Sequence, residues 1–293
     1  MPNPLNAMSE VDSRTLFEVS DYNLAATLTS GQAFRWTERE GCWEGVIAGR
    51  FVRLSQDPRG IVAETAAPVA NWRWLHSYLD VEIDFAAVIK SFPEDEPMRL
   101  ARESCKGLRL LRQEPWECLA SFILSSTKQI VQIQQIVDLL SRRFGEPIPS
   151  FHPGHDAFAF PTWDRLASAS ENSLRECKMG FRAPYLHATA RRLAEGKFDL
   201  ESLKHRTCAQ AREELVKLPG VGPKIADCVL LFGLGFPDAF PVDVWVQKAL
   251  QQLYFPRRKL KPDRLRRFVA SYFGPYSGYA QQYLFHHIRT KNV

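Results

Sequence analysis

The stretch LVKLPGVGPKIADCVLLFGLGFPDAFPVDVWVQK, residues 215–248, predicts two helices joined by a glycine hairpin, then a loop and a third helix. Residues 219–222 (Pro-Gly-Val-Gly) end the first helix, because glycines tolerate a positive φ and a close backbone approach. Pro223 suits the first position of the second helix, where no N–H donor is needed. Such a hairpin presents backbone N–H groups and a helix N-terminus, which bind anions such as nucleic-acid phosphates. A packing corner capped by glycine explains the same residues.

Lys224 falls in the first turn of the predicted second helix. The helix dipole disfavours a cation there, but the position suits an amine that is neutral and acts as a nucleophile. Asp243 follows nineteen residues later, at the start of the third helix, where it fits an N-cap. Capping alone is a sufficient reason for this Asp, although an ionised carboxylate can also stabilise a developing positive charge.

The composition sets broad limits on fold and function. The chain has 293 residues with 45% hydrophobic content, enough for a core and two or three subdomains. Its net charge of +5 suits a nucleic-acid enzyme without proving one. The six cysteines form no CxxC pair, so no zinc or iron–sulfur motif is predicted, and reduced thiols indicate an intracellular compartment. No apolar run reaches membrane length.

The order of the predicted elements indicates an α+β fold. Residues 16–64 favour short strands broken by turns, which predicts an antiparallel sheet of about five strands. Helices are expected at 69–79 and 85–91, and from residue 98 on nearly everything is helical. We therefore predict an antiparallel β domain with flanking helices at 1–100 and a helical domain at 101–293. The tail 289–291 is expected to be frayed.

Four segments together resemble a known family. LPGVGPKIADCV (218–229), FPVDV (240–244), SGQAFRW (30–36) and GYAQQYLF (278–285) are similar to motifs of the 8-oxoguanine DNA glycosylase/AP lyase family. That family lies within the helix-hairpin-helix superfamily of base-excision glycosylases. The matches span roughly residues 28–290, nearly the whole chain, and they are specific only in combination.

The resemblance implies a bifunctional enzyme that flips 8-oxoguanine out of double-stranded DNA and excises it. Lys224 would attack C1′ of the sugar and form a Schiff base, after which β-elimination nicks the strand. Asp243 would stabilise the sugar cation. No organic cofactor and no catalytic metal is implied, although a structural cation at the hairpin fits the superfamily. We expect a monomer that has no membrane partner. We expect it in the cytoplasm or nucleoid if the source is a bacterium, and in the nucleus if the source is a eukaryote.

The resemblance also assigns the base pocket. The Gly31 carbonyl would accept the N7 hydrogen that 8-oxoguanine has and guanine lacks, a difference worth about 1–3 kcal/mol. Gln281 would bind the base edge and Phe285 would stack on its face, since they are four residues apart on one helix face. Cys228 would cover the other base face, and Pro241 would touch the base. A turn glycine, a core phenylalanine and a small buried thiol remain alternative explanations.

DNA contacts are implied at the hairpin and on three further segments. Phe181 would wedge into the base stack while Arg182 holds the estranged cytosine, although a capping turn explains this pair equally. Better-known eukaryotic members carry asparagine, arginine and histidine where this chain has Thr127, Gln132 and Trp245. Those departures leave the reading of the opposite base open. The expected DNA-binding set is Thr127, Gln132, Phe181, Arg182, Gly220, Val221, Gly222 and Trp245.

Two other functions remain compatible with the sequence. A monofunctional alkylpurine glycosylase of the same superfamily also has an N-terminal β domain, but it would not need Lys224. A non-catalytic DNA-binding protein would use the hairpin for phosphates only. Borohydride trapping of a lysine–DNA adduct separates both from the bifunctional enzyme.

Overall fold

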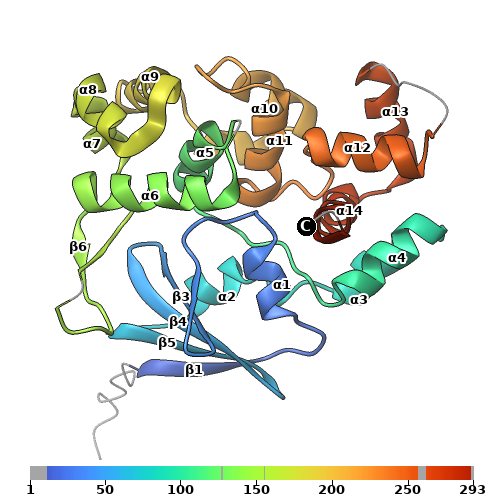
Figure 1. Ribbon diagram of the computed structural model, residues 1–293, viewed down its shortest axis with the longest axis horizontal. Helices are drawn as coiled ribbons and strands as arrows, with labels where there is room; N and C mark the ends of the chain where they lie inside the picture. The colour runs from blue at the N-terminus through green and yellow to red at the C-terminus, as the bar shows by residue number, and fades with distance from the viewer. Residues whose placement is uncertain (1–11, 127, 155, 257–261, 292–293) are drawn as a thin grey trace, which may run out of the picture.

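Five strands of the N-terminal part form one antiparallel sheet in the order β1-β5-β4-β3-β2 (Figure 1). The computed structural model describes residues 12–126, 128–154, 156–256 and 262–291. The strands of this sheet are β1 (Asp12–Glu18), β2 (Thr37–Arg39), β3 (Cys42–Ile47), β4 (Arg50–Asp57) and β5 (Gly60–Val69). The predicted sheet of about five strands is confirmed.

Tight turns set the register of this sheet. Ala48 and Gly49 both have positive φ values, 48° and 71°, between the paired residues Ile47 and Arg50. Two-residue loops of this kind match the right-handed twist of the strands that they join. β4 alternates in burial, with Val52 and Leu54 fully buried, so one face of the sheet lies against a core.

Two N-terminal expectations were wrong in detail. A helix, α1 (Leu24–Thr29), interrupts the predicted run of strands, and the Asn23 side chain caps it by accepting from the Ala26 N–H at 2.9 Å. The helix expected at 69–79 begins only at Arg73, as α2 (Arg73–Tyr78). Val69 instead ends β5, where it pairs with Asp12 of β1, because strand pairing continues beyond the local turn signals.

The rest of the described chain is mainly helical, as predicted (Figure 1). A two-stranded hairpin, β6 (Pro147–Ile148) and β7 (Ala157–Phe158), is the exception. The helical elements are α3 (Phe85–Lys90), α4 (Glu96–Ser104), α5 (Pro115–Leu124), α6 (Ile130–Phe144), α7 (Trp163–Ser168), α8 (Glu171–Leu174), η1 (Arg175–Met179), η2 (Gly180–Arg182), α9 (Ala183–Ala194), η3 (Glu201–His205), α10 (Cys208–Leu215), α11 (Pro223–Cys228), η4 (Val229–Gly233), α12 (Val244–Leu253), α13 (Pro262–Tyr272) and α14 (Ser277–Lys291).

Two hydrophobic cores divide the molecule. The smaller core lies under the sheet and includes Leu24, Trp36 and Leu54, together with α2. The larger core joins the helices and already includes Val88 of α3 and Met98 of α4. The predicted boundary at residue 100 stays a prediction, although α3 and α4 pack with the helical core and not with the sheet. No described helix is both long and apolar enough to cross a membrane.

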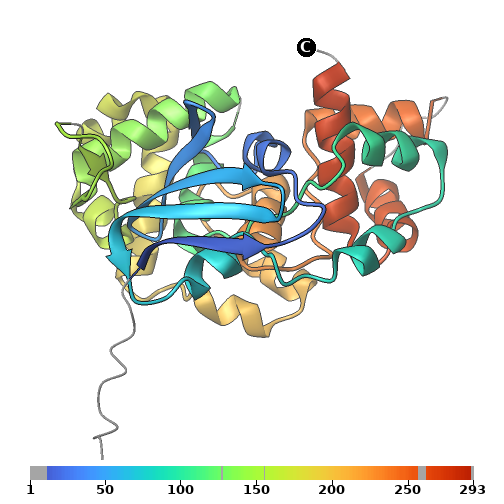
Figure 2. The same cartoon turned by 90° about the horizontal axis from the view of Figure 1, so that it is seen from below.

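The C-terminal helix α14 connects the two parts, and Figure 2 shows it rising beside α1 and α4. The expectation of a frayed tail at 289–291 was wrong, since α14 continues to Lys291. Arg289 is held in place because its Nη2 donates to the Thr29 carbonyl at the end of α1, at 2.6 Å. This contact spans nearly the whole chain, so local sequence signals do not reveal it.

Candidate active site

The glycine hairpin forms where the sequence predicts it, between α10 and α11. Gly220 has a φ of 77°, and a Cβ placed there would lie 2.7 Å from the Tyr185 Cβ, so both positive φ and close packing require glycine. Gly222 differs from the expectation: its φ is −95°, and a Cβ placed there would meet nothing within 4 Å. Open space at Gly222 leaves the backbone accessible in front of α11.

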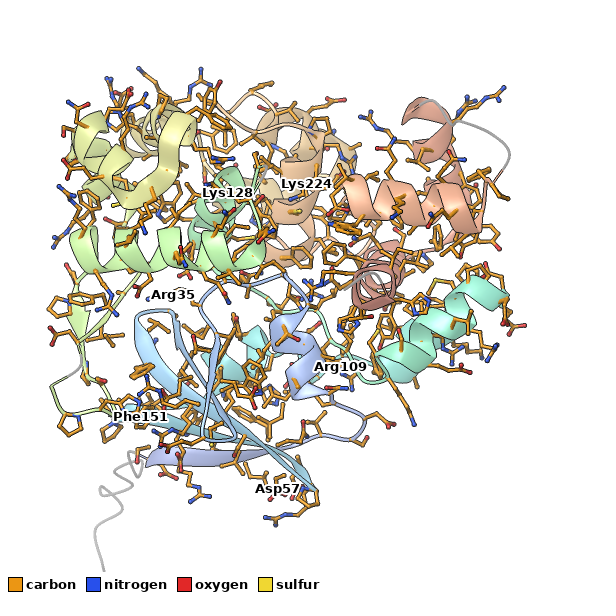
Figure 3. All side chains as sticks on the ribbon, in the orientation of Figure 1. Arg35, Asp57, Arg109, Lys128, Phe151 and Lys224 are labelled. Carbon is orange, nitrogen blue, oxygen red and sulfur yellow. The ribbon has the colours of Figure 1, made fainter. Side chains whose placement is uncertain are left out.

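Lys224 lies in the first turn of α11, directly after Pro223, as predicted. Its Nζ donates to the Ser125 Oγ at 3.2 Å and lies 5.1 Å from the centre of the Phe122 ring. Both partners belong to the C-terminal end of α5, and the lysine is half-buried between the helices. Figure 3 shows Lys224 at the junction between the α5–α9 and the α10–α14 groups of helices. The amine is therefore held by the Ser125 hydroxyl and lies against the apolar ring of Phe122, and it also hydrogen-bonds with the Cys228 thiol.

Asp243 is the N-cap of α12, as predicted. Its Oδ1 accepts a hydrogen bond from the Val246 N–H at 2.8 Å. The two residues that follow it are exposed, with 76% of Val244 and 36% of Trp245 accessible. Two exposed apolar side chains next to the carboxylate that caps α12 indicate a contact surface for another molecule.

Gln281 and Phe285 both lie on α14, and Phe285 comes close to Gly31 in space. The Gln281 side chain is 4% exposed, and its Oε1 is buried without a hydrogen-bond partner in the part of the chain that the structure describes. A Cβ added to Gly31, whose φ is 82°, would lie 3.5 Å from the Phe285 Cε1 and 2.9 Å from the Ile130 Cδ1. The Phe285 ring and the Gly31 backbone thus lie side by side, and Gln281, one helical turn before Phe285, has an unpartnered acceptor among the described residues. Their assignment to a base pocket stays a prediction.

Cys228 and Pro241 complete the predicted pocket set, and both are buried. Cys228 lies one turn beyond Lys224 on α11. Burial raises the pKa of the Cys228 thiol to about 12, although the nearby Lys224 opposes the shift. The thiol is therefore neutral at physiological pH and adds no negative charge beside the lysine.

Arg289 is a site residue that the sequence reasoning missed. Its guanidinium carbon lies 5.4 Å from the centre of the Phe285 ring, and its Nη1 would lie 3.1 Å from a Cβ on Gly31. Burial lowers the pKa of the Arg289 guanidinium, and the negative charge of Asp243 opposes that shift. Its four-residue spacing from Phe285 on α14 is the only sequence signal that could have revealed it.

The predicted wedge residues differ in exposure. Phe181 is 56% exposed, as a wedge requires, whereas Arg182 is only 3% exposed. The Arg182 guanidinium carbon lies 4.2 Å from the centre of the Phe181 ring, and its Nη1 donates to the Met179 carbonyl. Burial lowers the pKa of this guanidinium. Arg182 must therefore turn outward before it can hold a base.

The opposite-base region is only partly defined. Thr127 lies outside the described residues. Gln132 is exposed at the start of α6, where its Oε1 accepts from the Gln129 N–H at 3.1 Å. The backbone N–H of Lys128 donates to the Ser125 carbonyl at 3.2 Å. Lys128 therefore lies near Ser125, whose hydroxyl binds the Lys224 amine. A capping role competes with any base contact of the Gln132 carbonyl.

Metal ligands do not cluster in the described ranges: no group of three or more His, Cys, Asp or Glu side chains is arranged to hold an ion. At the hairpin, the carbonyls of Lys217 and Pro219 already accept from Arg192 and Thr189, at 2.8 and 3.0 Å. The structural cation expected at the hairpin stays a prediction, and these two carbonyls are poorly suited to ligate it.

A half-buried lysine in the first turn of the helix behind a glycine hairpin, with a capping aspartate at the start of a later helix, fits the class of helix-hairpin-helix DNA glycosylases. Comparison with family models agrees. Residues 14–119 match the model of the 8-oxoguanine DNA glycosylase N-terminal domain, and residues 120–275 match the HhH-GPD superfamily of base excision DNA repair proteins. The chain belongs to the 8-oxoguanine DNA glycosylase family of that superfamily.

Similar proteins support this assignment along nearly the whole chain. A probable N-glycosylase/DNA lyase of Methanothermobacter thermautotrophicus is 31% identical over 94% of this chain and 96% of its own length. The Arabidopsis thaliana N-glycosylase/DNA lyase OGG1 is 33% identical over 91% of this chain and 77% of its own length. A Clostridium acetobutylicum 8-oxoguanine glycosylase/lyase, solved with double-stranded DNA containing cytosine opposite 8-oxoguanine, is 32% identical with a TM-score of 0.88, covering 95% of this chain and 99% of that one.

Proposed function

We propose that this chain is a bifunctional N-glycosylase/DNA lyase that excises 8-oxoguanine from duplex DNA and then nicks the strand. The single observation that carries the proposal is Lys224, half-buried at the start of α11 with its Nζ beside Ser125 and Phe122. The family membership and the related glycosylase/lyase solved with lesion-containing DNA support the substrate.

The proposed chemistry assigns one role to Lys224 and one to Asp243. The Lys224 Nζ attacks C1′ of the lesion sugar while the bond from C1′ to the base breaks, and the base leaves with the bonding electrons and a proton. Ring opening gives the Schiff base, and loss of a C2′ proton then breaks the C3′–O bond by β-elimination. Asp243, which is held in place because it caps the start of α12, stabilises the positive charge that develops on the sugar.

Non-reacting residues bind the lesion and the duplex. Gln281 binds the edge of the flipped base, Phe285 stacks on one face and Cys228 covers the other. Phe181 fills the gap in the duplex and Arg182 holds the estranged base. Phosphates bind the hairpin at Gly220, Val221 and Gly222 without reading sequence, as helix N-termini bind anions. Neither an organic cofactor nor a catalytic metal is part of this proposal.

The decisive experiment uses one duplex with 8-oxoguanine and a matched duplex with 3-methyladenine. Borohydride should trap the wild-type protein covalently on the first duplex, with release of the oxidised base. An alkylpurine glycosylase would release only the second base and leave no adduct. A non-catalytic DNA-binding protein would bind both duplexes with the same salt dependence and release neither base.

Gln281→Ala and Phe285→Ala should each slow excision about fivefold to 150-fold, because each removes a base contact worth about 1–3 kcal/mol. Affinity for undamaged duplex should stay nearly unchanged, since phosphates supply most of it. Single-turnover kinetics and a salt titration measure the two quantities. If undamaged-DNA binding fell in parallel with excision, both residues would be structural and would not line the pocket.

Excision should discriminate weakly between cytosine and adenine opposite the lesion. A rigid guanidinium fork matches cytosine acceptors, but Gln132 replaces one such arginine, its Oε1 is engaged by Gln129, and Arg182 is buried. Losing a matched contact typically forfeits about 1–3 kcal/mol of discrimination. Single-turnover rates on the two duplexes decide the matter. A cytosine preference above roughly a hundredfold would mean that Arg182 or Lys128 reads the base alone.

The cellular setting follows from the substrate. We propose that the chain acts as a monomer on double-stranded DNA, without a membrane, in the cytoplasm or nucleoid of a bacterium or in a eukaryotic nucleus. Sedimentation with and without a duplex tests the first part. A stable dimer in the absence of DNA would contradict it.

A further inference from the structure

Of the four consecutive backbone carbonyls from Thr29 to Gln32, at the end of α1, three accept a hydrogen bond from a side chain of a described residue and one does not. The Thr29 carbonyl accepts from Arg289 Nη2 at 2.6 Å, and the Ser30 carbonyl accepts from Gln282 Nε2 at 3.0 Å. The Gln32 carbonyl accepts from Gln113 Nε2 at 2.6 Å. The Gly31 carbonyl, between them, has no hydrogen bond with any residue that the structure describes.

Both donors on the first two carbonyls come from α14. Gln282 and Arg289 lie about two helical turns apart, so they project from a similar face of that helix. The last carbonyls of a helix have no partner within it, and an arginine at a helix C-terminus is favoured by the dipole. Two side chains of α14 therefore donate hydrogen bonds to the carbonyls at the C-terminal end of α1, which have no backbone donor there among the described residues.

The same arginine also contacts the stacking residue of the pocket. Its guanidinium carbon lies 5.4 Å from the Phe285 ring centre, and its Nη1 lies close to Gly31. A Cβ on Gly31 would come within 2.9 Å of the Ile130 Cδ1 at the start of α6 and 3.1 Å of this Nη1, so a glycine is needed where the turn approaches α6 and α14. The Cα of Gly31 thus faces the side chains of Ile130, Phe285 and Arg289, and the two carbonyls that precede Gly31 are held by α14.

We propose that Gln282 and Arg289 form a clamp that aims the Gly31 carbonyl at the lesion, and that they are positioning residues for the recognition of 8-oxoguanine. This inference rests on the proposed function, since it assumes that the Gly31 carbonyl accepts the N7 hydrogen. A carbonyl that recognises a single hydrogen must keep its direction, because a hydrogen bond weakens steeply with angle. The clamp supplies that direction by engaging the two preceding carbonyls.

The test separates base recognition from lysine chemistry. A duplex with a pre-formed abasic site lacks the base, so its cleavage needs Lys224 but not the Gly31 carbonyl. Arg289→Met and Gln282→Met keep unbranched stems and remove the donors. Both should slow 8-oxoguanine excision about tenfold or more, the loss expected for one misplaced hydrogen bond, and leave abasic-site cleavage within about twofold of wild type. Arg289→Lys, which keeps a donor, should recover part of the loss.

A matched control is Arg99→Met, because Arg99 is an exposed arginine on α4 that pairs with Glu96 and Glu103. It loses the same charge and should excise at the wild-type rate. The clamp would be overturned if Arg289→Met and Gln282→Met slowed 8-oxoguanine excision and abasic-site cleavage equally, or if neither variant slowed 8-oxoguanine excision. A wild-type protein that cleaves abasic sites but never releases 8-oxoguanine would instead overturn the proposed function.

Discussion

Lys224→Gln should form no borohydride-stable adduct with 8-oxoguanine DNA, whereas the wild-type protein should form one in high yield. Glutamine keeps much of the length of the side chain and can still hydrogen-bond to Ser125, the only side-chain oxygen that the described structure places on the lysine amine. It lacks the lone pair of a neutral amine, so no covalent bond to C1′ can form. Base excision should fall by at least about a thousandfold.

The control for this substitution is Lys204→Gln. Lys204 lies in η3, is exposed and pairs with Glu201, so its replacement removes one positive charge from the surface without touching Ser125 or Phe122. Its adduct yield should match that of the wild type. Undamaged-duplex affinity of Lys224→Gln should also stay close to wild type. A normal adduct yield from Lys224→Gln would show that another amine is the nucleophile.

Asp243→Asn should separate helix capping from catalysis. Asparagine caps a helix about as well as aspartate, so the hydrogen bond to the Val246 N–H survives and the free energy of unfolding should change by less than about 1 kcal/mol. The negative charge is lost, however. If this charge stabilises the sugar cation, the single-turnover excision rate should fall by about a hundredfold to a thousandfold.

The matched control is Asp84→Asn, because Asp84 caps α3 in the same way by accepting from the Ala87 N–H at 3.0 Å. Its excision rate should stay at the wild-type value. Thermal unfolding of both variants measures the capping contribution. Near-normal excision by Asp243→Asn would mean that Asp243 serves only to cap α12. Slow excision with an unchanged melting temperature would support a catalytic role for its negative charge.

Turn and capping signals in the sequence predicted much of the site. The hairpin, Pro223 at the start of α11 and Asp243 at the start of α12 were all placed correctly. These features arise from φ preferences and hydrogen bonds within a few residues of the chain. The match to the family, carried by four short segments, added the expectation that Lys224 and Gly31 serve one reaction.

The tertiary structure decided what local patterns could not. Arg289 was expected in a frayed tail, yet it holds the Thr29 carbonyl. Arg182, which the resemblance expects to hold an unpaired base, lies buried beside Phe181, and its role stays a prediction. The capping contact of Gln132 was also not foreseen.

The residues assigned to the base pocket come from opposite ends of the chain, so only packing can bring them together. Gly31 follows α1, whereas Gln281, Gln282, Phe285 and Arg289 all lie on α14 at the other end of the chain. The sequence determined the hairpin, the caps and the family, because those depend on short-range backbone chemistry. Only the folded chain determined that the Gly31 carbonyl has no partner among the described residues, because donors from a helix roughly 250 residues away engage the carbonyls before it at the end of α1.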